Sequence, residues 1–174
     1  MDKDCMEADQ DCLKEFQTRI QNLRTESVRE LSKLRWNFSF TDDELFDKAV
    51  SVHQSGMSRR GRILEEIIEG LLRQRGVPFL TQVSDQSGII SPKKRGFVHD
   101  IIIDANLGDK LEDKIIVSCK TSIRERYKQD KNLKCKKLYL VTMEKVKDRE
   151  KYISNGITIV TVGTGELESM LSSF

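Results

Sequence analysis

Two residues that interrupt apolar runs are the strongest candidates for chemistry. The segment KIIVSCK, residues 114–120, alternates like a β-strand and ends on Lys120, while Asp100 interrupts the strand-like run FVHDIIID, residues 97–104. A carboxylate among isoleucines is costly unless it is paired or binds a metal. The sequence therefore favours either an Asp100–Lys120 ion pair that serves only the fold, or a site in which both groups act on a ligand.

A charged triplet follows the lysine at the start of a helix predicted over residues 123–133, IRERYKQDKNL. Arg124 and Arg126 can donate bidentately to guanine and Glu125 can accept from cytosine, which suits base readout in the major groove. Residues 93–137 carry 13 Lys and Arg against 7 Asp and Glu, a net charge of +6, in a chain whose total is +2. This clustering indicates a phosphate-binding face, and a merely solvated charged surface is the alternative.

The hydrophobic periodicity predicts the elements that would position these groups. Apolar residues three or four apart predict a helix over residues 13–34. A second helix begins at Thr41, which can form a capping box with Glu44, and a third begins after Ser58 and ends before Gly76. Strands are predicted at residues 78–83, 97–104, 114–120, 136–143 and 156–162, with a short final helix at 165–174. A turn at 104–113 makes residues 97–120 a hairpin.

The order of these elements predicts an α/β fold with a mixed sheet of about five strands flanked by helices. At 174 residues we expect one domain, with a helical N-terminal part at 1–56 and a core at 57–174. Hydrophobic residues make up 37% and charged residues 33%, and no apolar stretch reaches the roughly 20 residues of a membrane-spanning helix. We therefore expect a cytoplasmic protein without membrane partners. The four cysteines form no C-x-x-C pair, which predicts reduced thiols, with Cys119 on the apolar side of its strand.

These motifs resemble the PD-(D/E)XK nuclease superfamily, and more narrowly the EcoRII-type branch of type II restriction endonucleases. His99-Asp100 stands where Pro-Asp is usual, and Ser118-Cys119-Lys120 stands where (D/E)-X-K is usual. The branch pattern K-T-x-x-R-(D/E)-R-(W/Y) is matched by Lys120, Thr121, Arg124, Glu125, Arg126 and Tyr127. The segment SRRGRILEE, residues 58–66, is similar to a helix of that branch in which a glutamate corresponding to Glu65 faces the active site. The resemblance covers roughly residues 36–143 and implies a restriction-endonuclease-like core.

The resemblance also implies roles for individual residues. Asp100 is the expected main ligand of Mg²⁺, with the backbone carbonyl of Cys119 as a second, and Lys120 is expected to orient or deprotonate water. Serine at position 118 removes the usual second carboxylate, which the branch supplies thirteen residues after the lysine, where this chain has Leu133. Asp130, about one helical turn earlier, is the first candidate for that acid and Glu65 the next. Further DNA contacts are expected from Arg59, Lys93 and Lys94.

The hypothesis that follows is a Mg²⁺-dependent type II restriction endonuclease, acting as a homodimer on double-stranded DNA at a short palindrome that contains G·C pairs. A structure-specific repair or recombination nuclease of the same fold is one alternative. A DNA-binding protein without catalysis is another, in which Ser118 marks an inactive site.

Overall fold

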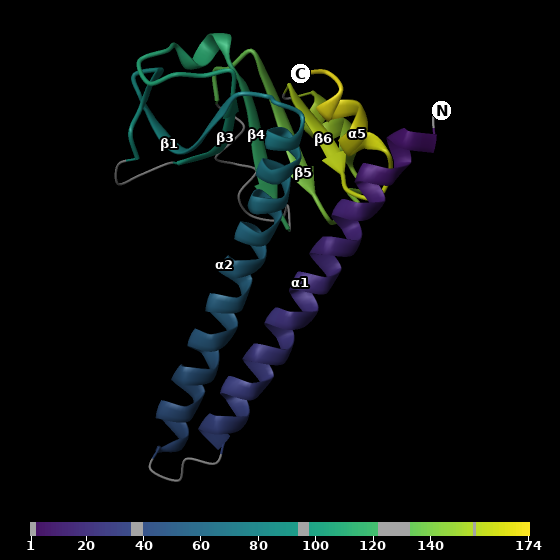
Figure 1. The fold of residues 1–174 in the computed structure, drawn as a ribbon. Helices are drawn as coiled ribbons and strands as arrows, with labels where there is room; N and C mark the ends of the chain where they lie inside the picture. Colours follow the sequence, from purple (N-terminus) through teal and green to yellow (C-terminus); the bar gives the residue numbers. More distant parts are fainter. Residues whose placement is uncertain (1–2, 36–39, 94–97, 122–132, 155) are drawn as a thin grey trace.

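Two long antiparallel helices and a six-stranded mixed sheet make up the computed structural model of the chain (Figure 1). The structure describes residues 3–35, 40–93, 98–121, 133–154 and 156–174. Helices α1 (Lys3–Arg35) and α2 (Asp42–Gln74) each have 33 residues and lie side by side. One end of this helical hairpin packs on the sheet, and the other end extends away from it (Figure 1).

Helix α2 is continuous where the sequence predicts two helices. It begins after the capping box at Thr41, whose side chain accepts from the Glu44 N–H, and it passes through Ser58 without a break. The predicted separation is wrong because packing on α1 overrides the weak helix propensity of the glycines and serines in this stretch. Ion pairs such as Arg59–Glu26, at 3.0 Å, join the two helices along their length. The expected boundary between residues 56 and 57 stays a prediction, and it falls inside α2.

The sheet has the strand order β2-β1-β3-β4-β5-β6. Its strands are β1 (Phe79–Gln86), β2 (Ile89–Ser91), β3 (His99–Ile103), β4 (Ile115–Lys120), β5 (Lys137–Thr142) and β6 (Ile157–Thr161). Neighbouring strands from β2 to β4 pair antiparallel, whereas β4, β5 and β6 pair parallel. The predicted α/β fold with a mixed sheet, flanking helices and a helical N-terminal part is confirmed, including the β3–β4 hairpin.

The remaining short elements are the 3₁₀ turn η1 (Leu111–Asp113) and the helices α4 (Arg149–Ile153) and α5 (Glu166–Leu171). Strand β2 and helix α4 have no counterpart among the predicted elements, and β2 raises the expected five strands to six. Both are too short, at three and five residues, for hydrophobic periodicity to reveal them.

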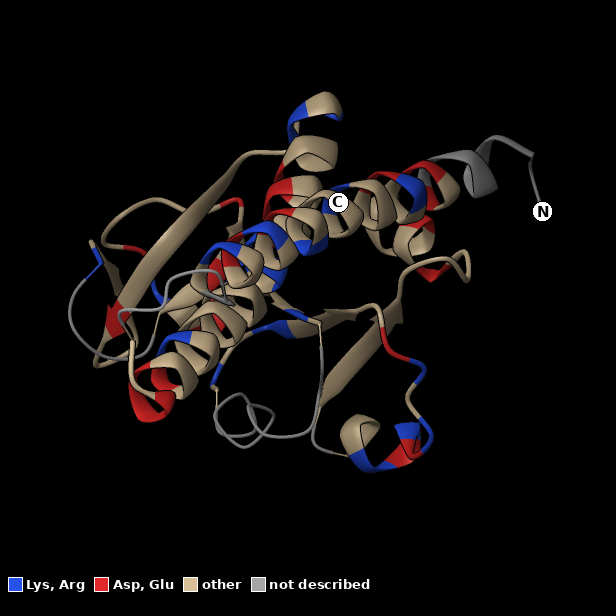
Figure 2. Ribbon diagram, turned by 90° about the horizontal axis from the view of Figure 1, so that it is seen from below, with Lys and Arg blue, Asp and Glu red and all other residues tan. Residues whose placement is uncertain are grey.

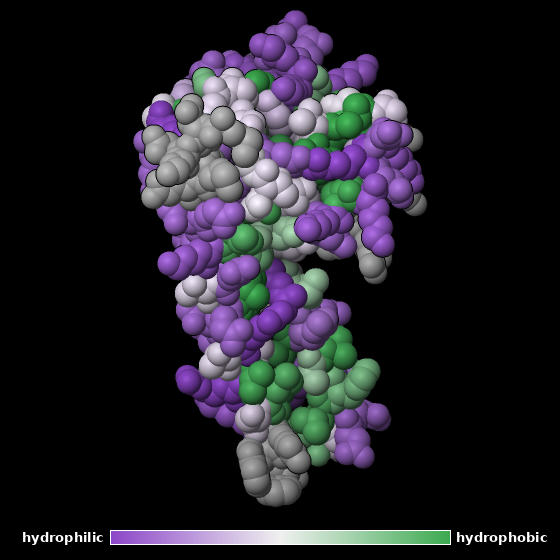
Figure 3. All heavy atoms as spheres, turned by 90° about the vertical axis from the view of Figure 1, so that its right-hand side faces the viewer, coloured by the Kyte–Doolittle hydropathy of each residue, from purple (hydrophilic) through white to green (hydrophobic). Residues whose placement is uncertain are grey.

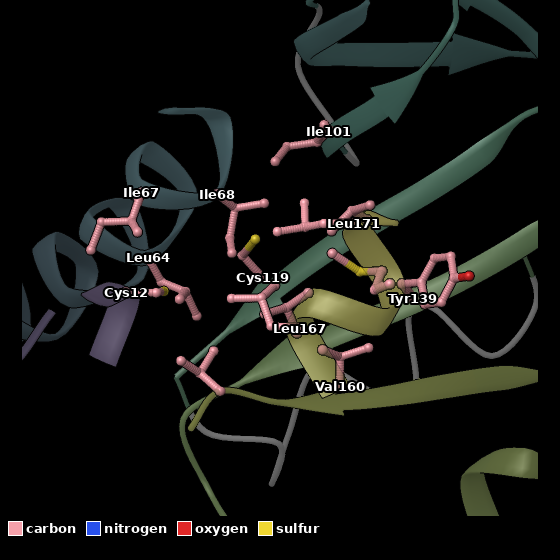
Figure 4. Packing of buried hydrophobic residues seen from close by; sticks show 14 of the residues in the cluster. Cys12, Leu64, Ile67, Ile68, Ile101, Cys119, Tyr139, Val160, Leu167 and Leu171 are labelled. Carbon is pink, nitrogen blue, oxygen red and sulfur yellow. The ribbon is translucent and has the colours of Figure 1, made fainter. Parts of the chain in front are cut away.

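Apolar residues form one cluster on each face of the sheet. On the first face, α1, α2 and α5 pack against alternate strand residues, as Figure 4 shows for Leu64, Leu167 and Cys119. On the opposite face a second cluster contains Ile102 and Ile116, together with residues of β2 and η1. The predicted alternation of β4 is therefore confirmed, because Cys119 and Ile116 belong to different clusters.

The described cysteines behave as the sequence predicts. Cys12 and Cys119 are buried and form no disulfide. Burial raises the pKa of the Cys12 thiol to about 12, and Asp9 and Glu15 add to this effect. Burial also raises the pKa of the Cys119 thiol well above its usual value. These two thiols therefore stay protonated. No helix within the described ranges is both long enough and apolar enough to cross a membrane.

Leu64 provides a test of the helix–sheet contact. Because its side chain is 0% exposed in the first cluster, Leu64→Ala should lower the free energy of unfolding by about 2–5 kcal/mol. Leu107, which is 55% exposed, is the matched control, and Leu107→Ala should change it by less than about 0.5 kcal/mol. Urea titration followed by circular dichroism measures both values, and equal effects would contradict the packing of α2 on the sheet.

Candidate active site

Asp100 and Lys120 meet at the end of the β3–β4 hairpin. Lys120 is the last residue of β4, and its Nζ lies 2.7 Å from Asp100 Oδ2. The side chain of Asp100 is 12% exposed and that of Lys120 is 15% exposed, so the ion pair is mostly buried but still in contact with solvent. The Asp100–Lys120 ion pair is therefore present, and its surroundings bear on which of the two alternatives holds, a contact that serves only the fold or a site that acts on a ligand.

Three donors converge on a single oxygen of Asp100. Besides Lys120, the backbone N–H of Cys119 donates to Oδ2 at 2.8 Å, and the Ser118 hydroxyl donates to it at 3.3 Å. No residue within the described ranges donates to Oδ1. A carboxylate fixed through one oxygen, with the other left for a ligand, is suited to binding a metal ion. A purely structural ion pair needs no such asymmetry.

Glu65 brings a second carboxylate from α2. It is half-buried, and burial raises its pKa to about 7, an effect that the negative charge of Asp100 increases and that Lys120 opposes. The two carboxylates are therefore close enough for the charge of Asp100 to act on Glu65. A divalent cation between such acids would relieve both the repulsion and the lost hydration.

Gln82 of β1 connects Glu65 to a basic residue. Its Nε2 donates to Glu65 Oε2 at 3.1 Å, and its Oε1 accepts from Lys93 Nζ at 3.1 Å. Lys93, expected to contact phosphate, therefore lies next to the acids through one intervening amide. Sequence reasoning missed Gln82, because neither its residue type nor its spacing sets it apart within β1.

His99 occupies the position where the resembling family has proline. Its side chain is buried, and Nε2 lies 3.0 Å from Asp85 Oδ1 on the neighbouring strand β1. This contact fixes β3 against β1 one residue before Asp100. Although His99 replaces the usual proline, strand β3, which carries Asp100, is therefore still held against β1 by this contact.

The other predicted site residues fall into two groups. Arg59 of α2 forms an ion pair with Glu26 of α1. Figure 2 shows that Lys, Arg, Asp and Glu are interspersed along the helical hairpin. The proposed DNA contact of Arg59 stays a prediction. Outside the described residues lie Lys94, Arg124, Glu125, Arg126 and Asp130, so base readout and the first candidate for the second acid stay predictions too.

The donor set fits Mg²⁺, which the resembling family implies. Mg²⁺ takes oxygen ligands. The Asp100 Oδ1 atom and the Glu65 carboxylate can supply such ligands, and both side chains are partly exposed to solvent. No group of three or more His, Cys, Asp or Glu side chains arranged for a metal occurs in the described part of the chain. A metal ion bound here would therefore have the two carboxylates and backbone carbonyls as ligands from the described residues, and water would fill its other positions.

Comparison with known proteins gives distant relatives. No protein-family model matches the chain. It is 24% identical over 177 aligned positions to the type II restriction enzyme SsoII of Shigella sonnei, covering 93% of this chain and 58% of SsoII. The structure is similar to that of Can2 from Sulfobacillus thermosulfidooxidans, solved in complex with cyclic tetra-adenylate, with a TM-score of 0.52 and 14% identity. That likeness covers 99% of this chain and 54% of Can2, and it concerns the fold.

The sequence similarity to SsoII supports a distant relationship to a type II restriction enzyme, and the likeness to Can2 supports only the fold. The chain spans little more than half the length of either protein. The narrower EcoRII-type assignment stays a prediction.

The raised pKa of Glu65 has a testable consequence in the metal-free protein. The folded protein binds more protons than the unfolded chain between pH 4.5 and about 7, so its stability should fall as pH rises through this window. Glu65→Gln should remove this contribution, and Asp100→Asn should lower the pKa of Glu65 toward 4.5. Urea titrations across the window with EDTA present, and ¹³C NMR of the Glu65 carboxyl, measure the two effects.

The exposed Glu30→Gln is the control for that titration, and it should leave the pH profile unchanged. A Glu65 carboxyl that titrates near 4.5 in the folded protein would contradict the described environment.

Proposed function

We propose that the protein is a Mg²⁺-dependent type II restriction endonuclease that cuts both strands of DNA at a short palindrome containing G·C pairs. The observation that carries the proposal is the Asp100 carboxylate, held through Oδ2 by Lys120 and by the Cys119 N–H, with Oδ1 available and Glu65 beside it. The distant similarity to SsoII supports the same class of activity.

In the proposed reaction, Asp100 would hold Mg²⁺ together with the Cys119 carbonyl and an acid, for which Asp130 and Glu65 are the candidates. The bound ion would act as a Lewis acid toward the phosphate and would lower the pKa of a bound water. Its affinity for two carboxylates also explains why the chain tolerates the electrostatic cost of placing Glu65 near Asp100.

Lys120 has two tasks in this proposal. Its ammonium group, 2.7 Å from Asp100, can orient the attacking water and can also neutralise charge on a non-bridging phosphate oxygen. The strand end fixes the position of Lys120, since the residue pairs in register with Thr142 of β5. A lysine held in this way can move between carboxylate and phosphate with little rearrangement of the backbone.

Sequence selection is assigned to Arg124, Glu125 and Arg126. The triplet follows Lys120 by four to six residues, so one segment would deliver both chemistry and base contacts. Lys93, Lys94 and Arg59 would contact phosphates without regard to sequence.

We also propose that the active form is a homodimer, because a palindrome presents two equivalent strands and each chain offers one catalytic centre. The far part of the helical hairpin exposes apolar side chains, visible as green atoms in the lower half of Figure 3. On the helical hairpin, Val28 is 62% and Met57 is 43% exposed. Both border a groove of about 270 Å³ between α1 and α2. This surface is available for contact with a second copy.

Substitution of the two central residues tests the reaction. Lys120→Ala and Asp100→Ala should each slow plasmid cleavage by at least about 10²-fold, because each removes a group that acts on water, metal or phosphate. Lys110→Ala and Asp113→Asn, at exposed positions, are matched controls and should cleave like wild type. Gel analysis of a plasmid of known sequence, followed by sequencing of the fragment ends, measures rate and site together.

The outcomes of that digest separate the alternatives. Wild-type cleavage without sequence preference would favour a structure-specific nuclease. Binding of DNA without cleavage in any divalent metal would favour a protein that only binds DNA.

The base contacts give a separate prediction. Arg124→Ala or Arg126→Ala should cost about 1–3 kcal/mol of discrimination at one G·C pair, because a bidentate contact to guanine is lost. Lys93→Ala should instead weaken binding to all sequences and flatten its salt dependence. Binding to cognate and singly mismatched duplexes in Ca²⁺, at two salt concentrations, distinguishes the two patterns. Equal loss on every duplex would show that the arginines contact only phosphates.

A further inference from the structure

Gln82 adopts a backbone conformation that is unusual for its place in the fold. Its φ is +53°, in the left-handed region, although it lies in the middle of β1. The other residues with side chains and positive φ, within the described ranges, are Ser87 and Asp104, which follow the ends of β1 and β3. Left-handed backbone is ordinary in turns, whereas within a strand it is strained and interrupts pairing.

The interruption falls directly opposite Asp100. In the antiparallel register of β1 and β3, Thr81 pairs with Ile101 and Val83 pairs with His99, which places Gln82 across from Asp100. The strained residue is therefore the cross-strand neighbour of the proposed metal ligand. Strain that persists at such a position is typical of functional sites.

Both ends of the Gln82 amide are in use. The Nε2 group donates to Glu65, and Oε1 accepts from Lys93, each at 3.1 Å. A carboxylate at position 82 could not donate to Glu65, and an ammonium group could not accept from Lys93. The amide therefore suits the position chemically, as a bridge between an acid on α2 and a base in the segment after β2.

We infer that Gln82 is a positioning residue, which holds the Glu65 carboxylate toward Asp100 for metal binding and ties it to Lys93. The inference rests on the proposed function and deepens it, because it assigns Glu65 a role at the metal. The left-handed backbone at Gln82 turns its side chain to α2, and the hydrogen bond fixes one Glu65 oxygen, while no residue in the described ranges donates to the other. Partners of this kind around metal ligands commonly change metal affinity or activity by about 10–100-fold when removed.

Two variants separate this role from a structural one. Gln82→Gly removes both hydrogen bonds and also the backbone strain, since glycine adopts positive φ freely. Gln82→Met removes the hydrogen bonds while keeping a side chain of similar length. Ser87→Gly is the matched control, because Ser87 has the same φ of +53° but lies exposed in the β1–β2 turn.

The experiment titrates Mg²⁺ into each purified protein by calorimetry, and measures single-turnover plasmid cleavage and the melting temperature alongside. Both Gln82 variants should bind Mg²⁺ about 10–100-fold more weakly, and added Mg²⁺ should partly restore their cleavage rate. Gln82→Gly should melt at or above the temperature of Gln82→Met. Ser87→Gly should match wild type in Mg²⁺ affinity and in cleavage.

Wild-type Mg²⁺ affinity and cleavage in Gln82→Met would overturn the inference. So would losses that follow the melting temperature alone, because they would mark a structural role. A wild-type protein that binds Mg²⁺ without cutting DNA would instead overturn the nuclease proposal, and the Mg²⁺ titrations would still decide the role of Gln82.

Discussion

The contact between Asp100 and Lys120 is the constraint on which the rest of the site depends. A carboxylate placed on a strand next to buried isoleucines destabilises a fold unless donors surround it. Here an ammonium, a backbone amide and a hydroxyl supply those donors, all from β4 and all to one oxygen. The antiparallel register of β3 and β4 thereby fixes both the stability of the hairpin and the direction in which the second oxygen points.

Helix α2 and strand β1 also place one side chain each near Asp100. Helix α2 packs its apolar side, including Leu64 and Ile68, on the first face of the sheet, and this fixes the helix so that the adjacent Glu65 comes near Asp100. Strand β1 contributes Gln82 opposite Asp100. Helix α2 and strands β1, β3 and β4 therefore all contribute groups to the site, and the hydrophobic core sets the positions of these groups relative to one another. A substitution that changes the packing of the core is therefore expected to change the geometry of the site as well.

Much of this arrangement could be predicted from the sequence, because it follows from periodicity. The alternation of residues 114–120 placed Cys119 in the core and Lys120 at the strand end, and the lone acid at 100 indicated its pairing. What failed was the division of α2, where tertiary packing outweighed local propensity, and the recognition of β2, which is only three residues long. The role of Gln82 could not be predicted from the sequence, because its left-handed backbone and its position opposite Asp100 arise only once β1 and β3 are paired.

The electrostatics of the site suit the proposed binding of a cation. Two carboxylates from different elements face one lysine, and burial together with the charge of Asp100 raises the pKa of Glu65 to about 7. An arrangement selected for stability alone would replace Glu65 with an apolar residue, since the repulsion and lost hydration only destabilise the metal-free fold. In the proposed complex, a divalent cation would offset the repulsion between Glu65 and Asp100, and the glutamine that links Glu65 to Lys93 would bring a basic group near the bound phosphate. On the proposed function, the unfavourable electrostatics of the unliganded site would therefore be relieved when the ligands bind.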